Sequence, residues 1–229
     1  PVGAIFAYKT AGLDKDGYPL FVTKDGQTVT ATEFLKLNNA GASTLTAEEQ
    51  RAQYTYMGST DPKVSGGFTN TFKFKGFTLG INCIFNLGMS VRTTPSYSPT
   101  NYDRGLNTNH DILNRWTPEN PTSTLPKLMT SDERPGEYIR YAEFGLFSNL
   151  DIWVKKQNYF RFQSIRLGYD LPEKWLRPLG VKSANVSLEG RNLWVIASNY
   201  DNYLDPETMG NLYAQPIPKS FIFGLNINF

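Results

Sequence analysis

The sequence predicts an all-β protein built from long antiparallel strands, and three observations carry that prediction. The 229 residues are rich in aromatic residues and glycine, with 15 Phe, 13 Tyr and 19 Gly. Stretches rich in helix-favouring residues are nearly confined to positions 31–53. Several segments alternate between apolar and polar positions, which is the period of a strand. We therefore expect six strands, at 2–9, 67–75, 77–89, 159–171, 184–196 and 219–229.

The first two expected strands, 2–9 and 67–75, carry apolar side chains at positions of one parity. They are Val2, Ala4, Phe6 and Tyr8 in the first and Phe68, Phe72 and Phe74 in the second. The long connection 12–66 separates them. The Lys-Gly pair at 75–76 then predicts a tight turn into the next strand.

The clearest strand is 77–89. Its odd positions are all apolar, and five of its six even positions are small or polar. At ~3.3 Å per residue these thirteen residues span roughly 43 Å, and a tilt of about 45° projects that length to about 30 Å, the thickness of a bilayer core. Strands of soluble proteins usually have about 5–6 residues. The length therefore favours a membrane-spanning strand.

The next two strands change phase near the middle. In 159–171 the apolar residues shift parity at 163–164, which predicts a β-bulge. In 184–196 a similar shift falls at 190–192, after which Leu193 and Val195 take the opposite parity. The polar side chains of 190–192 either face a lumen or mark a second structural bulge.

The last strand alternates aromatic and aliphatic residues with mostly polar or small ones and ends on a terminal Phe. The alternating residues are Phe221, Phe223, Leu225, Ile227 and Phe229. This pattern is typical of the closing strand of a bacterial outer-membrane barrel, where it serves as the C-terminal barrel-assembly signal. A terminal edge strand of a soluble sandwich is the alternative.

The lengths of the connections alternate along the chain. The long connections 12–66, 90–158 and 197–219 are separated by the shorter ones at 75–77 and 172–183. That alternation is the pattern of transmembrane β-barrels, and connections beyond about 15 residues are uncommon in compact soluble domains. Six strands are fewer than the about 8 of the smallest bacterial barrels. We therefore expect a fragment or processed product, which agrees with a start at Pro1 and no initiator Met.

Composition excludes several classes of function. The net charge of +2 and the scattered basic residues argue against nucleic-acid binding. A single Cys excludes an internal disulfide framework and a Cys-based zinc site, and a single His disfavours a His-dependent triad. Residues 14–17 resemble the start of a calcium loop but lack the Glu at the twelfth position, so we expect a small hairpin around 20–23. We expect neither enzyme activity nor a cofactor or metal site.

Seven segments, in order along the whole chain, resemble motifs of one family. They are 1–8 (PVGAIFAY), 61–70 (DPKVSGGFTN), 116–121 (WTPENP), 158–172 (NYFRFQSIRLGYDLP), 188–194 (LEGRNLW), 205–207 (DPE) and 215–229 (QPIPKSFIFGLNINF). The chain is thereby identified as similar to the C-terminal portion of SusC/RagA-family TonB-dependent outer-membrane transporters of Bacteroidetes.

The resemblance implies that 1–229 supplies the last six antiparallel strands of a large transmembrane β-barrel of about 22 strands. The connections 12–66, 90–158 and 197–219 would be extracellular, and the plug domain and earlier strands are absent from this chain. The implied role is nutrient uptake of oligosaccharides or peptides, delivered by a SusD-type surface lipoprotein. Energy would come from the TonB complex through the plug. A soluble β-rich glycan-binding module and a passive porin-type barrel are the alternatives.

Aromatic residues in or beside the largest connection are candidate contacts to a substrate or to the lipoprotein. They are Tyr97, Tyr102, Trp116, Tyr138, Tyr141 and Trp153. Such rings stack on sugar faces or pack against a partner. The alternative is an aromatic girdle or packing inside the loop, which we favour for each residue taken singly.

Overall fold

The computed structural model describes residues 2–37, 46–93, 97, 104–106, 108, 110–128, 146–198, 205–208 and 215–229. The chain divides into two compact units. The first comprises Pro1–Thr60, Ser90–Lys155 and Gly210–Leu212, and the second comprises Asp61–Met89, Lys156–Met209 and Tyr213–Phe229.

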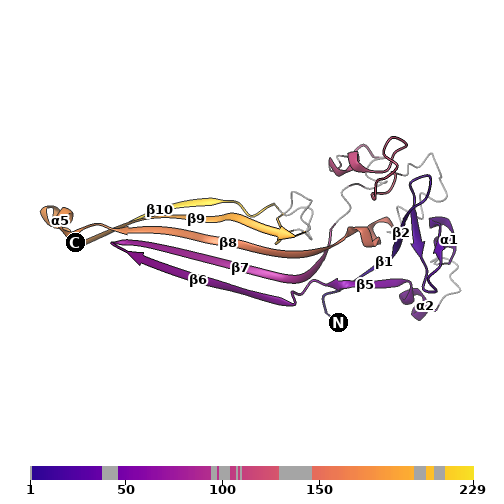
Figure 1. Ribbon diagram of the computed structural model, residues 1–229, viewed down its shortest axis with the longest axis horizontal. Coiled ribbons are helices and arrows are strands. Elements are labelled where there is room, and N and C mark those ends of the chain that lie inside the picture. Colours follow the sequence, from indigo (N-terminus) through magenta and orange to yellow (C-terminus); the bar gives the residue numbers. More distant parts are fainter. Residues whose placement is uncertain are drawn as a thin grey trace. The chain divides into compact units, whose positions relative to one another are not determined.

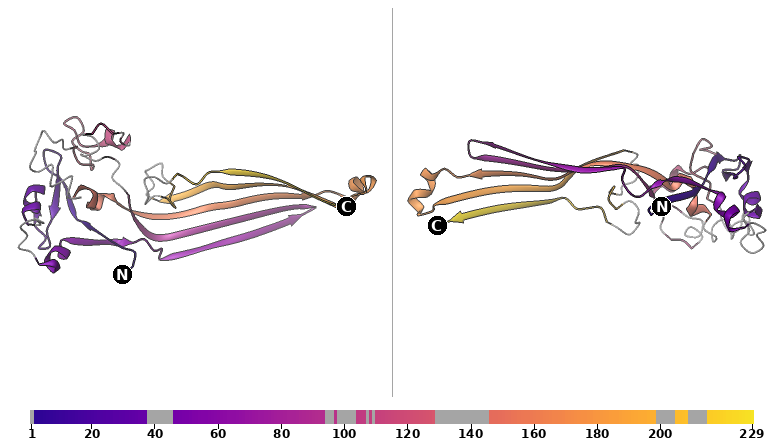
Figure 2. Two further views of the ribbon diagram at one scale, coloured as in Figure 1. Left: turned by 180° about the vertical axis from the view of Figure 1, so that it is seen from behind. Right: turned by 90° about the horizontal axis from the view of Figure 1, so that it is seen from below.

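The second unit is built on a five-stranded antiparallel sheet with the order β10-β9-β8-β7-β6 (Figures 1 and 2). Its strands are β6 (Val64–Phe74), β7 (Phe77–Arg92), β8 (Val154–Asp170), β9 (Ser183–Ser198) and β10 (Ser220–Asn228). Five of the six predicted strands thus form and lie together in this sheet. With 16, 17 and 16 residues, β7, β8 and β9 are even longer than predicted. At ~3.3 Å per residue each spans about 50 Å.

The tight turn predicted between β6 and β7 is confirmed. Lys75 and Gly76 have φ values of 45° and 84°, and the last residue of β6 pairs with the first residue of β7. Positive φ at both central residues is the requirement of a type I′ turn, whose twist matches that of the strands it joins.

The irregularity predicted in the middle of β8 is confirmed, and the register places its extra residue on β9. Phe162 pairs with Trp194 and Ser164 pairs with Arg191, so two steps along β8 match three along β9. Asn192, within the longer stretch, has a φ of 54°. The phase shifts expected separately in the two strands are therefore the two sides of one irregularity.

One detail of β9 differs from the expectation. Val195 does not join the apolar face after the bulge, because it pairs with Arg161, whose side chain lies on the opposite, polar face. Trp194 takes that place, and its ring makes an edge-to-face contact with Phe162 at 5.9 Å between centroids. The extra residue in β9 restores the earlier parity, which alternation alone does not reveal.

The first predicted strand forms but lies outside the five-stranded sheet. β1 (Ala4–Tyr8) pairs antiparallel with β5 (Tyr54–Ser59) in a separate two-stranded sheet of the first unit. The sequence YTYMGS of β5 lacks a regular apolar alternation, so this partner was assigned to a connection.

The predicted small hairpin around 20–23 is present within a three-stranded sheet. Its strands, in the order β2-β3-β4, are β2 (Thr10–Leu13), β3 (Pro19–Val22) and β4 (Thr28–Val29). The Asp14 carboxylate accepts hydrogen bonds from the backbone N–H groups of Asp16 and Tyr18, both at 2.9 Å. This carboxylate therefore shapes the turn, as an Asx turn does.

The helices are short. They are α1 (Ala31–Leu37), α2 (Ala47–Ala52) and α5 (Glu173–Leu176), with 3-10 turns η1 (His110–Asn114), η3 (Phe147–Asn149), η4 (Asp151–Trp153) and η5 (Arg177–Leu179). α1 and α2 fall in the predicted helix-favouring stretch. Within the described ranges, none of the helices has the length and apolar character needed to cross a membrane.

The first unit has a hydrophobic core of its own. Phe21 of β3 and Phe34 of α1 are fully buried and stack at 4.5 Å between ring centroids. The other buried members are Tyr18, Ala31, Leu35, Tyr97, Leu128, Leu146, Phe147, Leu150 and Trp153. Segments expected to be connections thus bury apolar area as a small domain does.

Candidate functional site

The strand register sorts the side chains of the five-stranded sheet onto an apolar and a polar face. Directly paired residues of adjacent strands share a face. Phe72 pairs with Leu79 at one edge, and Phe223 pairs with Leu188 at the other. The exposed apolar members of this face are Val64, Phe68, Phe72, Phe74, Phe77, Leu87, Leu167, Leu188, Trp194, Ile196, Phe221, Phe223, Leu225 and Ile227. We call this set the apolar face.

Ring contacts join the apolar face across the strands. Phe68 of β6 approaches Phe160 of β8 to 6.0 Å between centroids, and Cys83 of the intervening β7 is fully buried. Nearer the turn, Phe77 and Tyr169 lie 4.4 Å apart. A continuous exposed apolar surface of this kind marks contact with a membrane or another protein.

Four of the five residues proposed as a C-terminal assembly signal lie on this face. Phe221, Phe223, Leu225 and Ile227 occupy alternate positions of β10. Phe229 follows the strand, and its backbone oxygen accepts a hydrogen bond from Lys182 Nζ at 2.8 Å. Their role in barrel assembly stays a prediction.

The opposite surface carries hydrogen-bonded amides and hydroxyls, and we call it the polar face. Thr69 Oγ1 donates to Asn82 Oδ1 at 3.1 Å, and Asn82 Nδ2 donates to Gln163 Oε1 at 3.0 Å. Asn86 Nδ2 donates to the Tyr159 hydroxyl at 2.6 Å. These bonds link three adjacent strands side chain to side chain.

A buried ion cluster lies on the polar face. Arg161 of β8 is 2% exposed and forms an ion pair with Asp205, which is 6% exposed. Arg161 Nε also lies 2.6 Å from Glu207 Oε1. Asp205 Oδ1 accepts a further bond from the Glu207 N–H at 3.0 Å. The segment 205–208 is therefore attached to the sheet through one guanidinium.

The sequence identified one half of this cluster and missed the other. The motif 205–207 stands out in the sequence, whereas Arg161 is one residue within the strand motif 158–172. A charged residue between Phe160 and Phe162 was the available signal, because a strand rarely buries a charge without a partner.

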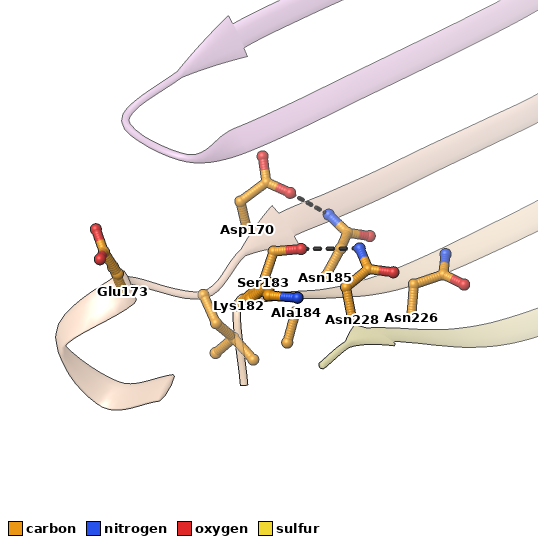
Figure 3. A pocket seen from close by; sticks show the side chains of 9 residues that line it. Asp170, Glu173, Lys182, Ser183, Ala184, Asn185, Asn226 and Asn228 are labelled. Carbon is orange, nitrogen blue, oxygen red and sulfur yellow. Dashed lines mark hydrogen bonds between the residues drawn. The ribbon is translucent and has the colours of Figure 1, made fainter. Parts of the chain in front are cut away.

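A second feature of the polar face is a hollow of about 380 Å³ where β8, β9 and β10 meet α5 (Figure 3). Its polar lining residues are Asp170, Glu173, Lys182, Ser183, Asn185, Asn226 and Asn228. Asn185 Nδ2 donates to Asp170 Oδ1 at 2.6 Å, and Asn228 Nδ2 donates to Ser183 Oγ at 2.8 Å. Nowhere in the described part of the chain do His, Cys, Asp and Glu gather as a metal-binding group.

Two of the predicted aromatic contact residues lie in the core of the first unit. Tyr97 and Trp153 are 2% and 4% exposed, and their rings meet edge to face at 5.9 Å. The Tyr97 hydroxyl donates to the backbone oxygen of Pro126, and Trp153 Nε1 donates to that of Phe147. These observations support packing inside the loop for this pair.

The other aromatic candidates have different surroundings. Trp116 is partly buried, and its ring lies so close to Gly17 that a Cβ there would come within 2.4 Å of it. Its role as a contact residue stays a prediction. Tyr102, Tyr138 and Tyr141 lie outside the described residues.

Comparison with curated proteins gives two relatives from Formosa agariphila. The chain is 28% identical over 194 residues to TonB-dependent receptor P26, covering 76% of this chain and 18% of that protein. It is 23% identical over 244 residues to TonB-dependent receptor P3, covering 100% of this chain and 22% of that protein. The chain thus spans about a fifth of the length of these relatives. No family model matches it.

Solved structures give the same result for the fold. The RagAB peptide transporter matches with a TM-score of 0.66 at 24% identity, over 99% of this chain and 23% of that one. The RagAB peptide importer in an open-open state matches with a TM-score of 0.68 at 22% identity, over 100% of this chain and 23% of that one.

The long two-faced strands and these matches make the chain similar in fold to the barrel wall of a TonB-dependent transporter. They confirm the all-β antiparallel fold and the recognition that the motifs predicted. The chain is similar to part of the TonB-dependent receptors of a Bacteroidetes and, in fold, to part of RagAB.

Proposed function

We propose that the chain forms part of the wall of a TonB-dependent importer in the bacterial outer membrane. The observation that carries the proposal is the apolar face, which crosses all five strands opposite a polar face. Barrel strands in a membrane alternate in this way between lipid and lumen. Strands of about 50 Å, tilted as in barrels, are long enough to cross the bilayer.

The remaining wall comes from the rest of the same barrel in this proposal. β6 and β10 are the outer strands of the sheet, and an unpaired strand edge in a bilayer leaves backbone groups unsatisfied. The polar face, with the cluster of Arg161, Asp205 and Glu207, then faces the lumen.

Import follows from the resemblance of the motifs along the chain. The intact protein takes up oligosaccharides or peptides that a SusD-type lipoprotein delivers, and the TonB complex acts through a plug domain. The connections 12–66, 90–158 and 197–219 are extracellular, with the core of the first unit supporting the surface toward the lipoprotein. This wall segment needs no catalytic chemistry.

The orientation of the wall is tested by labelling neighbouring positions of β10 in the native protein. Leu225→Cys and Asn226→Cys are made in a background with Cys83→Ala and no other reactive cysteine. A charged maleimide in water should label position 226 and spare position 225, which pairs within the apolar face. Equal labelling of both positions would contradict a lipid-facing apolar face.

Import is tested separately, by disrupting the gene in the source organism. Growth on one class of oligosaccharides or peptides should be lost in the disrupted strain. In a separate experiment on the undisrupted strain, a lipoprotein should copurify with the detergent-solubilised protein. A passive porin predicts instead that uptake persists when the TonB complex is inactivated. Unchanged growth on both nutrient classes would contradict the importer and leave the wall assignment standing.

A further inference from the structure

The connection between β8 and β9 is a helical turn that exposes large apolar side chains. It consists of α5 (Glu173–Leu176) followed by η5 (Arg177–Leu179). Trp175 is 56% exposed and Leu179 is 73% exposed, whereas Leu176 is buried. The turn is ordered by backbone bonds, because the Trp175 N–H donates to the Pro172 oxygen and the Val181 N–H donates to that of Leu176.

The helix geometry separates Trp175 from Glu173. Glu173 lines the polar hollow together with Asn185 and Asn226 (Figure 3). At about 100° per residue, Trp175 lies roughly 200° around the helix axis from Glu173. It therefore lies on the opposite side of the turn from Glu173.

The apolar face extends to the end of the sheet next to this turn. Phe77 and Tyr169, whose rings are in contact, lie at the end of the sheet from which β8 enters the turn. Gly180, with a φ of 70°, ends the helical turn and returns the chain to β9. The exposed Trp175 and Leu179 thus follow in the chain after the end of a surface that, in the proposed function, is covered by lipid.

The turn is also basic. Lys174, Arg177 and Lys182 stand against the single acidic residue Glu173 in 172–182. Lys174 and Arg177 are exposed, and neither forms an ion pair with any residue that the structure describes. Tryptophan with flanking Lys or Arg is the composition found at membrane interfaces, where the ring lies among headgroups and the cations meet lipid phosphates.

We infer that the α5–η5 turn is a membrane-interface anchor of the barrel wall. Trp175 and Leu179 enter the headgroup region of the adjacent leaflet, and Lys174 and Arg177 bind phospholipid phosphates. The occupant is lipid because the turn exposes large apolar side chains next to the end of the apolar face and its charge complements phosphate. This inference rests on the proposed function, since it requires the apolar face to contact the bilayer.

The test uses the intact protein reconstituted in vesicles of phosphatidylcholine and phosphatidylglycerol. A fluorophore is attached to Leu179→Cys, in the background without Cys83 or other reactive cysteines. Glu173→Cys, in the same turn but lining the polar hollow, is the matched control, and Leu225→Cys reports on the apolar face itself. The vesicles contain lipids that carry a spin label either near the headgroup or near the end of the acyl chain. The spin label that quenches the fluorescence more strongly reports the depth of the fluorophore.

The anchor predicts that the headgroup spin label quenches position 179 several-fold more than position 173. Position 225 should be quenched most by a spin label deeper in the acyl region. Quenching at 225 with equally weak quenching at 179 and 173 would overturn the anchor and leave the barrel wall intact. A lack of quenching at 225 would instead contradict the proposed function, and the anchor with it.

A second arm tests the cations. Lys174→Gln together with Arg177→Gln should weaken headgroup quenching at position 179 when phosphatidylglycerol is present, because anionic lipid attracts juxtamembrane Lys and Arg. In vesicles of phosphatidylcholine alone the same double substitution should have a smaller effect. Equal quenching of the two proteins in the anionic vesicles would overturn the phosphate contact.

Discussion

Arg161 and Asp205 form an ion pair on the polar face although 44 positions separate them in the chain. Both side chains are almost fully buried, and Glu207 adds a second carboxylate to the same guanidinium. Burying a charge is costly unless a partner compensates it. The pair therefore couples the conformation of 205–208 to the middle of β8.

We predict that Arg161→Met destabilises the protein by about 3–5 kcal/mol, because it leaves a buried carboxylate without its partner. The segment 205–208 should become sensitive to protease, and the thermal midpoint of the detergent-solubilised native protein should fall. Arg161→Met combined with Asp205→Asn should lower the free energy of unfolding by less than the sum of the losses from the two single substitutions.

Arg166→Met is the matched control for Arg161→Met. Arg166 lies on the same strand but is exposed, and among the described residues its side chain makes one bond, of 3.3 Å, to Ser187 Oγ. Its replacement should change the stability by no more than about 0.5 kcal/mol. Equal losses at positions 161 and 166 would show that the burial of the Arg161 cluster is not what stabilises this region.

The strands of the sheet were predictable because their signal is local. Alternation in 77–89 needs no knowledge of a partner, and the structure extends that strand only to Phe77–Arg92. The bulge between Phe162 and Ser164 was visible for the same reason, since an added residue shifts every later side chain to the other face.

Features that depend on distant partners were not predictable. β1 was expected in the large sheet, but its pairing depends on β5, a strand without apolar alternation. Tyr97 and Trp153 are residue types that stack on ligands, but in the structure both are buried in a core. Only the fold distinguishes these roles, because the same rings serve both.

We predict that Leu225→Lys prevents most of the protein from folding in the outer membrane. A Lys on the lipid side of a barrel costs about 2–4 kcal/mol near the bilayer midplane, whereas one on the lumen side costs little. The measurement is the fraction of folded, heat-modifiable protein in outer-membrane fractions. Asn226→Lys, one residue along β10, should leave that fraction nearly unchanged. Leu225→Ala is a further control, which removes the leucine side chain without adding a charge.

The β6–β7 turn offers a test of backbone conformation. Gly76 has a φ of 84°, and a Cβ there would lie 3.2 Å from the backbone oxygen of Asp170. We predict that Gly76→Ala costs about 1–2 kcal/mol, the usual penalty for an L-residue in the left-handed region. Thermal midpoints should show the loss. Gly80→Ala is the control, because its Cβ would meet no atom closer than 3.9 Å.

The start of α1 predicts a dependence on pH. The Thr30 N–H and hydroxyl both donate to Glu33 Oε2 at 2.9 Å, and the Glu33 N–H donates to Thr30 Oγ1 at 3.3 Å. These bonds, which form a capping box, hold the pKa of Glu33 below its usual value. A lowered pKa means that the stabilisation is present above the unfolded pKa of about 4.3 and is lost as the pH falls through the folded pKa.

Glu33→Gln should therefore remove this pH dependence while keeping an acceptor for the Thr30 N–H. Amide-exchange protection of Phe34 and Leu35, corrected for intrinsic rates, should fall in the native protein between about pH 5 and pH 3, and fall less in the variant. The control is Asp25→Asn, an exposed carboxyl five residues before Thr30 that has no hydrogen bond within the described residues. The pH profile of amide-exchange protection in the control should match that of the native protein. If Glu33→Gln also shows the native profile, the capping box does not govern the acid sensitivity of α1.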